Sequence, residues 1–89
     1  MTDILRLPDE LGRALRERRE ALGMSKSELA ARAGKVREVI YRLEAGEDST
    51  VSSLMAVLGA LGLAIRLEGV GLPSAEEVAR RFQEEDDAS

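Results

Sequence analysis

Residues 25–47 read SKSELAARAGKVREVIYRLEAGE and contain two short helical patterns separated by a glycine. Ser25 stands three residues before Glu28, which is the spacing of a capping box and predicts a helix over Lys26–Ala33. Gly34 is a typical helix stop, and a second apolar period begins only two residues later. That period consists of Val36, Val39, Ile40 and Leu43. The stretch therefore predicts two short helices joined by a tight turn.

The flanking sequence predicts one helix on each side. Pro8 and Asp9 supply a turn and an N-cap for a first helix that Gly23 ends. Thr50 can cap a fourth helix that ends at Gly62. Apolar spacing gives each helix an expected inward face. These faces are Leu11, Ala14, Leu15 and Leu22 in the first helix, and Val51, Leu54, Met55, Leu58 and Leu61 in the fourth.

The apolar period changes after the fourth helix. Leu63, Ile65 and Leu67 alternate with other residues, which predicts a half-buried strand over residues 63–68. A lone strand leaves its backbone unpaired, so it needs either residues 4–7 or the same strand of a second subunit, which we favour. Further on, Ser74 and Glu77 repeat the capping-box spacing and predict a short helix reaching Phe82.

The amino-acid composition excludes most kinds of catalytic and metal-binding site. The chain has no histidine and no cysteine, so the common nucleophile and base pairs and transition-metal sites cannot be assembled. We expect no enzyme, no metal and no cofactor. The N-terminus is acidic where a secretory signal would be basic, and the apolar stretches are short, which predicts a cytoplasmic protein with no membrane partner.

Charge is segregated along the chain, although its net value is only -4. Residues 13–42 hold nine basic and four acidic side chains, whereas residues 43–89 hold three basic and ten acidic ones. The basic part suits a phosphate-bearing partner. Two short helices with a basic second helix have the geometry needed to lay one helix in a major groove. On this pattern alone, a plain helical bundle is the alternative.

The run LGRALRERREALGMSKSELAARAGKVREVIYRLEAGE, residues 11–47, resembles the Xre/lambda-repressor helix-turn-helix family. The similarity extends to residue 62. Its anchor positions are Leu11, Arg16, Arg19, Gly23, residues 25–30, Ala33, Gly34, Ile40, residues 42–44, Gly46, Leu54 and residues 60–62. The extension at residues 63–68 further resembles the HipB-like antitoxin branch, whose dimers pair such strands and repress their own operons. The resemblance implies a sequence-specific transcriptional regulator, the antitoxin and autorepressor of a type II toxin-antitoxin operon.

Carried over position by position, the resemblance implies a set of DNA-binding residues. They are Lys26, Lys35, Arg37, Glu38, Tyr41 and Arg42. Arginine can bind guanine in a bidentate manner, glutamate can accept from cytosine, and lysine can meet phosphate. Arg19 and Glu44 stand where the family often has a structural ion pair. The expected dimer interface is formed by Leu63, Ile65 and Leu67.

These inferences define an all-α, lambda-repressor-like domain of four to five helices with a short C-terminal strand paired across a homodimer. We divide the chain into an N-terminal arm (1–8), the helix-turn-helix DNA-binding domain (9–62), a dimerisation strand with a short helix (63–82) and a disordered acidic tail (83–89). The expected partners are a double-stranded DNA operator, a second copy of the chain and a cognate toxin bound by the acidic half.

Two positions depart from the family pattern. Val36 stands where many relatives carry a serine or threonine that caps the recognition helix. Glu47 and Asp48 follow that helix where a DNA-contacting loop would more usefully carry lysine. Two alternatives therefore stay open: a phage-type or housekeeping repressor without a toxin, and an interaction module that has lost DNA binding.

Overall fold

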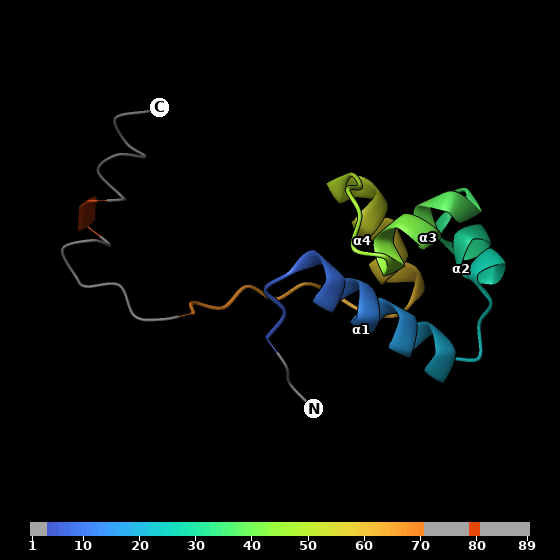
Figure 1. The fold of residues 1–89 in the computed structure, drawn as a ribbon, viewed down its shortest axis with the longest axis horizontal. Coiled ribbons are helices and arrows are strands. Elements are labelled where there is room, and N and C mark those ends of the chain that lie inside the picture. Colours follow the sequence, from blue (N-terminus) through green and yellow to red (C-terminus); the bar gives the residue numbers. More distant parts are fainter. Residues whose placement is uncertain (1–3, 71–78, 81–89) are drawn as a thin grey trace.

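The computed structural model describes residues 4–70 together with Ala79 and Arg80. Its helices are α1 (Pro8–Ala21), α2 (Lys26–Ala33), α3 (Arg37–Glu44) and α4 (Val51–Ala60). They pack into one small body with α2 and α3 side by side (Figure 1). The predicted all-α fold and its four helices are confirmed. None of the helices in the described ranges is long and apolar enough to cross a membrane.

The boundaries of α2 follow from its capping groups. The Glu28 amide donates to the Ser25 hydroxyl at 3.0 Å, and the Ser25 amide donates to the Glu28 carboxylate at 3.2 Å. At the other end Gly34 adopts a left-handed conformation with φ of 67°. Glycine enters this region without steric cost, so the chain can turn sharply into α3.

The start of α1 differs from the prediction. Leu7 is the N-cap residue and Pro8 takes a first-turn position, so the assignment of Asp9 as the cap was wrong. Proline suits this place because the first helical amides have no intrahelical partner and its fixed φ is already helical. Asp9 lies in the first turn, where its carboxylate faces the positive end of the helix dipole.

The core lies where α2 meets α3 and α4, with α1 packed against α3. Its most deeply buried large side chains are Leu15, Leu29, Ile40, Val57 and Leu61. Gly12 sets how closely α1 approaches α3, because a Cβ atom there would lie 2.5 Å from the Glu44 carbonyl oxygen. The missing side chain therefore allows α1 to cross directly over the end of α3.

Two of the expected inward faces need correction. Leu22 follows α1 as its C-cap residue and is exposed. In α4, Val51 and Met55 are exposed, whereas Val57 and Ser53 are buried. Ser53 tolerates burial because its hydroxyl is hydrogen-bonded to that of Thr50 at 2.8 Å. Helix α4 is apolar around most of its circumference, so the spacing alone did not identify the buried side.

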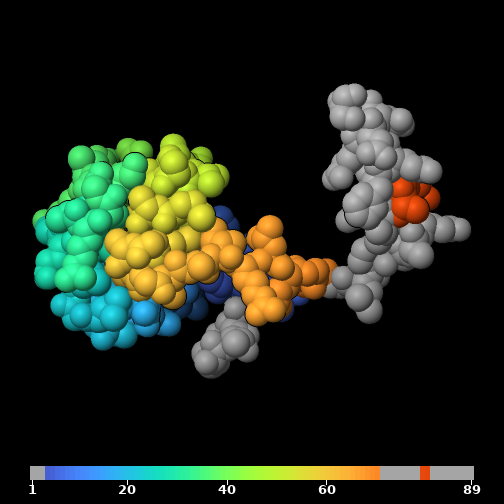
Figure 2. Space-filling view, turned by 180° about the vertical axis from the view of Figure 1, so that it is seen from behind, coloured from blue at the N-terminus to red at the C-terminus, as the bar shows by residue number. Residues whose placement is uncertain are grey.

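The segment after α4 leaves the helical body. The Leu63 amide donates to the Leu58 carbonyl oxygen at 2.8 Å, and residues 64–70 form no backbone hydrogen bond in the described part of the chain. This segment, orange in Figures 1 and 2, extends away from the helices. No backbone hydrogen bond joins it to residues 4–7. The predicted strand over residues 63–68 is therefore not formed within a single chain, and its pairing between subunits stays a prediction.

The remaining sequence-based assignments fall mostly on residues that are not described. The helix expected from Ser74 to Phe82 lies outside the described residues except for Ala79 and Arg80, which are helical. The acidic tail at residues 83–89 lies outside them altogether.

Candidate nucleic-acid interface

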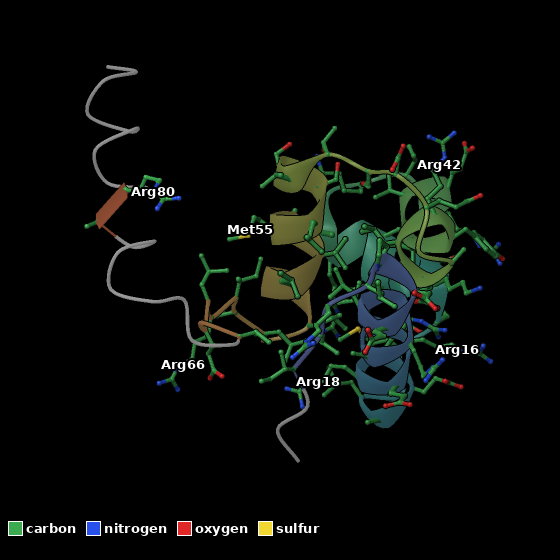
Figure 3. The ribbon with its side chains drawn as sticks, turned by 60° about the vertical axis from the view of Figure 1, so that its left-hand side comes forward. Arg16, Arg18, Arg42, Met55, Arg66 and Arg80 are labelled. Carbon is green, nitrogen blue, oxygen red and sulfur yellow. The ribbon has the colours of Figure 1, made fainter. Side chains whose placement is uncertain are left out.

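Helix α3 has one buried side and one charged side. Ile40 and Leu43 enter the core, whereas Arg37, Glu38 and Arg42 are exposed to solvent. Arg42 projects away from the body in Figure 3. We define the recognition surface as the six residues assigned to DNA, which are Lys26, Lys35, Arg37, Glu38, Tyr41 and Arg42. All of them lie in α2, in α3 or in the turn between the two helices.

Tyr41 brings two cations of the recognition surface together. The Lys26 Nζ atom lies over its ring, 3.9 Å from the centroid, and the Arg37 guanidinium carbon lies 5.1 Å from the same centroid. Arg37 also donates a hydrogen bond to the Tyr41 hydroxyl at 2.6 Å. The first residues of α2 and α3 are thus connected through a single aromatic side chain.

A second pair lies further along α3. Arg42 donates to the Glu38 carboxylate at 3.0 Å, one helical turn away, and both side chains are more than half exposed. An exposed pair of this kind contributes little to stability because water and salt screen it. Its effect is to hold a donor group and an acceptor group next to each other on the outer side of α3.

The start of α3 lacks a side-chain cap, as the sequence predicted. Val36 is the N-cap residue, makes no capping hydrogen bond and is 68% exposed. Lys35 precedes it in the turn, where its backbone amide donates to the Ala30 carbonyl oxygen at 2.9 Å. The amino end of α3 is therefore open to solvent next to two basic residues, Lys35 and Arg37.

Arg19 and Glu44 form a buried bidentate ion pair below this surface. The Arg19 Nε atom lies 2.7 Å from the Glu44 Oε2 atom, and its second guanidinium nitrogen donates to Oε1 at 3.0 Å. The remaining nitrogen donates to the Met24 carbonyl oxygen at 2.9 Å. Hydrogen bonding to Glu44 raises the pKa of Arg19 above its ordinary value, against the effect of burial. The pair fixes the end of α3 against α1.

Arg18 has a structural contact that the sequence did not suggest. Its Nε atom donates to the Leu61 carbonyl oxygen at 3.0 Å, which attaches α1 to the end of α4. A basic group at this place satisfies one of the free carbonyls that every helix leaves at its C-terminus. No periodicity or motif marked Arg18, because the contact depends on how α1 and α4 lie in space.

The side of the molecule away from Arg42 carries several exposed apolar side chains. Met55 projects from α4 on the side away from Arg42, the same side on which the segment bearing Arg66 leaves the body (Figure 3). We define the apolar segment as Leu63, Ile65 and Leu67, whose exposed fractions are 36%, 47% and 90%. Large apolar side chains with this much contact to water mark a surface that suits a partner.

Comparison with known proteins agrees with this geometry. The fold and the charged outer side of α3 define a helix-turn-helix protein, and a family model described as helix-turn-helix matches residues 15–67. The chain belongs to this family of DNA-binding regulators, of the Xre/lambda-repressor type. No match was found among curated proteins.

Solved structures of HipB are similar to this chain. A HipA-HipB-O2-O3 complex matches with a TM-score of 0.73 and 24% identity, over 79% of this chain and 100% of the other. A HipB-O4 20mer complex gives the same four values. A HipB-O1-O2 complex matches with a TM-score of 0.71 and 25% identity, over 76% of this chain and 100% of the other. The match supports the HipB-like branch that the sequence suggested.

Proposed function

We propose that this protein is a homodimeric repressor that places α3 in the major groove of an operator. The observation that carries the proposal is the two-sided character of α3. Ile40 and Leu43 fix the helix in the core, and Arg37 and Arg42 point outward from the opposite side. A helix held by its apolar side and exposed along its cationic side can enter a groove without unfolding the domain.

The five charged members of the recognition surface each have a role that fits their chemistry. Arg37 and Arg42 can each bind a guanine through two hydrogen bonds, and Glu38 can accept from the amino group of a cytosine. Lys26 is the first residue of α2 and Lys35 lies in the turn before α3, where phosphate contacts would fix the orientation of the protein on the duplex. The carboxylate of Glu38 repels phosphate, so it also disfavours a helix that is misplaced onto the DNA backbone.

The second copy is proposed to bind through the apolar segment. Pairing residues 63–68 of two subunits would bring Ile65 and Leu67 into contact with the second copy and satisfy those backbone groups of residues 64–68 that face the partner strand. A two-fold dimer of this kind presents two α3 helices about one helical turn of DNA, roughly 34 Å, apart. The expected operator is therefore a palindrome.

The test is an electrophoretic shift with a duplex from the protein's own promoter, repeated over a range of salt concentrations. Binding should be specific to that duplex and should weaken steeply as salt rises, because each phosphate contact releases counterions. Equal affinity for an unrelated duplex, or no affinity for either, would contradict the repressor. The second outcome would favour the interaction module, which the acidic loop residues Glu47 and Asp48 also suit.

We further propose that the protein is an antitoxin. The support is the likeness to a structure in which HipB is bound to HipA, together with the acidic character of residues 43–89. A basic partner protein would fit that half of the chain. Co-expression with the neighbouring gene and copurification of its product would support the antitoxin. Operator binding without any such partner would identify a repressor of the phage or housekeeping type.

A further inference from the structure

Tyr41 differs from the other residues of the recognition surface, because its ring and its hydroxyl oxygen each contact a basic side chain within the protein. One face of its ring lies under the Lys26 Nζ atom, 3.9 Å from the centroid. Its hydroxyl accepts a hydrogen bond from Arg37 at 2.6 Å. Tyr41 as a whole is 43% exposed, but the ring face under Lys26 and the oxygen that accepts from Arg37 are already engaged within the protein.

The two cations come from different helices. Lys26 is the first residue of α2 and Arg37 is the first residue of α3, and Tyr41 lies one turn further along α3. Long basic side chains have many rotamers, and DNA binding must select one of them. An aromatic ring next to a cation favours one arrangement by about twofold to fivefold in equilibrium constant at an exposed site. Tyr41 exerts this effect on two side chains at once.

We propose that Tyr41 is a positioning residue, which holds Lys26 and Arg37 in their DNA-contacting arrangement and does not itself read a base. The proposal rests on the repressor function proposed above, but it assigns Tyr41 a different role from the direct contact that the sequence resemblance implied. Ordering both side chains before binding lowers the conformational entropy that is lost on the DNA. Direct stacking of Tyr41 on a base is the competing outcome of the test.

The arrangement can be tested first in the free protein. Tyr41 is the single tyrosine and the chain has no tryptophan, so tyrosine fluorescence reports on this residue alone. In Lys26→Ala the ring face should become more accessible, and quenching by acrylamide should increase. The matched control is Arg16→Ala, which removes an exposed arginine that pairs with Glu20 on α1. Unchanged quenching in Lys26→Ala would overturn the stacked arrangement.

The second test uses DNA selected by the wild-type protein from a random duplex library. Tyr41→Phe keeps the ring under Lys26 but removes the hydroxyl that accepts from Arg37, and it should lower affinity about twofold to tenfold, the factor expected for the loss of one hydrogen bond. The loss should disappear when the same change is made in an Arg37→Ala background. In an Arg42→Ala background it should persist, because Arg42 is paired with Glu38 instead. Low salt keeps the weaker variants measurable.

The outcomes separate the two proposals. If the library yields no enriched duplex, the repressor function is wrong, while the fluorescence test still decides whether the stack exists. If Tyr41→Phe weakens binding equally in the Arg37→Ala and Arg42→Ala backgrounds, Tyr41 contacts DNA directly and the positioning role is wrong. Unchanged affinity of Tyr41→Phe in the wild-type background would contradict it as well. Circular dichroism of each variant confirms that the protein remains folded.

Discussion

The recognition surface and the apolar segment lie on different sides of the molecule and differ in how far one chain completes them. On the recognition surface, Tyr41 contacts both Lys26 and Arg37, and Arg42 is paired with Glu38. In the apolar segment Leu67 is 90% exposed, and the backbone from residue 64 to residue 70 is unpaired within the described chain. The first surface is ordered by contacts within one chain, whereas the second is left exposed and unpaired by one chain and is the proposed site of pairing with another.

This difference shows how the two surfaces divide the proposed function. A surface already ordered by internal contacts loses little entropy when it meets a rigid partner such as duplex DNA. An apolar segment with free backbone groups gains both burial and hydrogen bonds by pairing with a copy of itself. Because the two surfaces share no residue, variants of the recognition surface should lose DNA binding and remain dimers, whereas variants of the apolar segment should lose the dimer and bind the palindrome more weakly as a consequence.

The largest expected effect is the loss of DNA binding in Arg37→Ala combined with Arg42→Ala. Each bidentate arginine contact to guanine is worth about 1–3 kcal/mol, and a dimer carries two copies of each. Operator affinity, measured by fluorescence anisotropy, should fall by roughly 1000-fold or more on this basis. Sedimentation should still report a folded dimer.

A control variant separates the effect of where the arginines lie from the effect of losing two positive charges. Arg13→Ala with Arg16→Ala removes two exposed arginines from α1, outside the recognition surface. Its affinity should fall much less than that of the α3 variant. Equal losses in the two double variants would mean that net charge, and not the arrangement on α3, produces the binding.

The next effect is the conversion of the dimer to a monomer by Ile65→Asp. Burying an isoleucine side chain contributes about 1.5–3 kcal/mol, and the change removes this from both copies while adding two charges. Sedimentation velocity should show monomers at concentrations where the wild type is dimeric. Ala64→Asp is the control, because neighbouring residues of a strand point to opposite faces. A dimer that survives Ile65→Asp would place the interface elsewhere.

A smaller effect is expected from the buried pair that fixes α3 below the recognition surface. Arg19→Ala leaves the Glu44 carboxylate buried without its partner and should cost about 3–5 kcal/mol of unfolding free energy, measured by urea denaturation. The double change Arg19→Met with Glu44→Leu should recover most of that loss. If the double variant is as unstable as Arg19→Ala, the ion pair itself adds to the free energy of unfolding and does not only orient α3 against α1.

The pH dependence of this pair follows from the pKa of Arg19. Hydrogen bonding to Glu44 raises that pKa, so the stabilisation is fully present below the ordinary arginine value and is lost only as pH rises through the raised value. Near neutral pH, the thermal midpoints of the wild type and of Arg19→Met with Glu44→Leu should therefore change with pH in the same way.

The sequence predicted those parts of the structure that depend on neighbouring residues in the chain. Ser25, Glu28 and Gly34 act within a few residues of each other, so the bounds of α2 were correct. The buried side of α4 was wrong because Val51 and Met55 are as apolar as the residues that enter the core. Hydrophobicity alone does not separate the apolar side chains that pack in the core from those that remain exposed.

The candidate site shows the same limit. The family resemblance assigned Lys26, Arg37 and Tyr41 to DNA binding but did not predict that they contact one another. Their contact depends on the angle at which α2 meets α3. The contact of Arg18 with the Leu61 carbonyl was missed for the same reason, since 43 residues separate the two. Local motifs determine the helices, and the packing between helices determines which side chains of the site meet.

The smallest expected effect concerns the start of α3, next to the recognition surface, where Val36 provides no side-chain cap. Val36→Ser should supply the missing acceptor for a first-turn amide and raise the unfolding free energy by about 1 kcal/mol. Little packing is lost, because Val36 is 68% exposed. Val36→Ala is the control, since it removes the same side chain without adding a cap. If Val36→Ser raises the thermal midpoint no more than Val36→Ala does, water already satisfies the first-turn amides of α3. The missing cap then has no cost in the free protein.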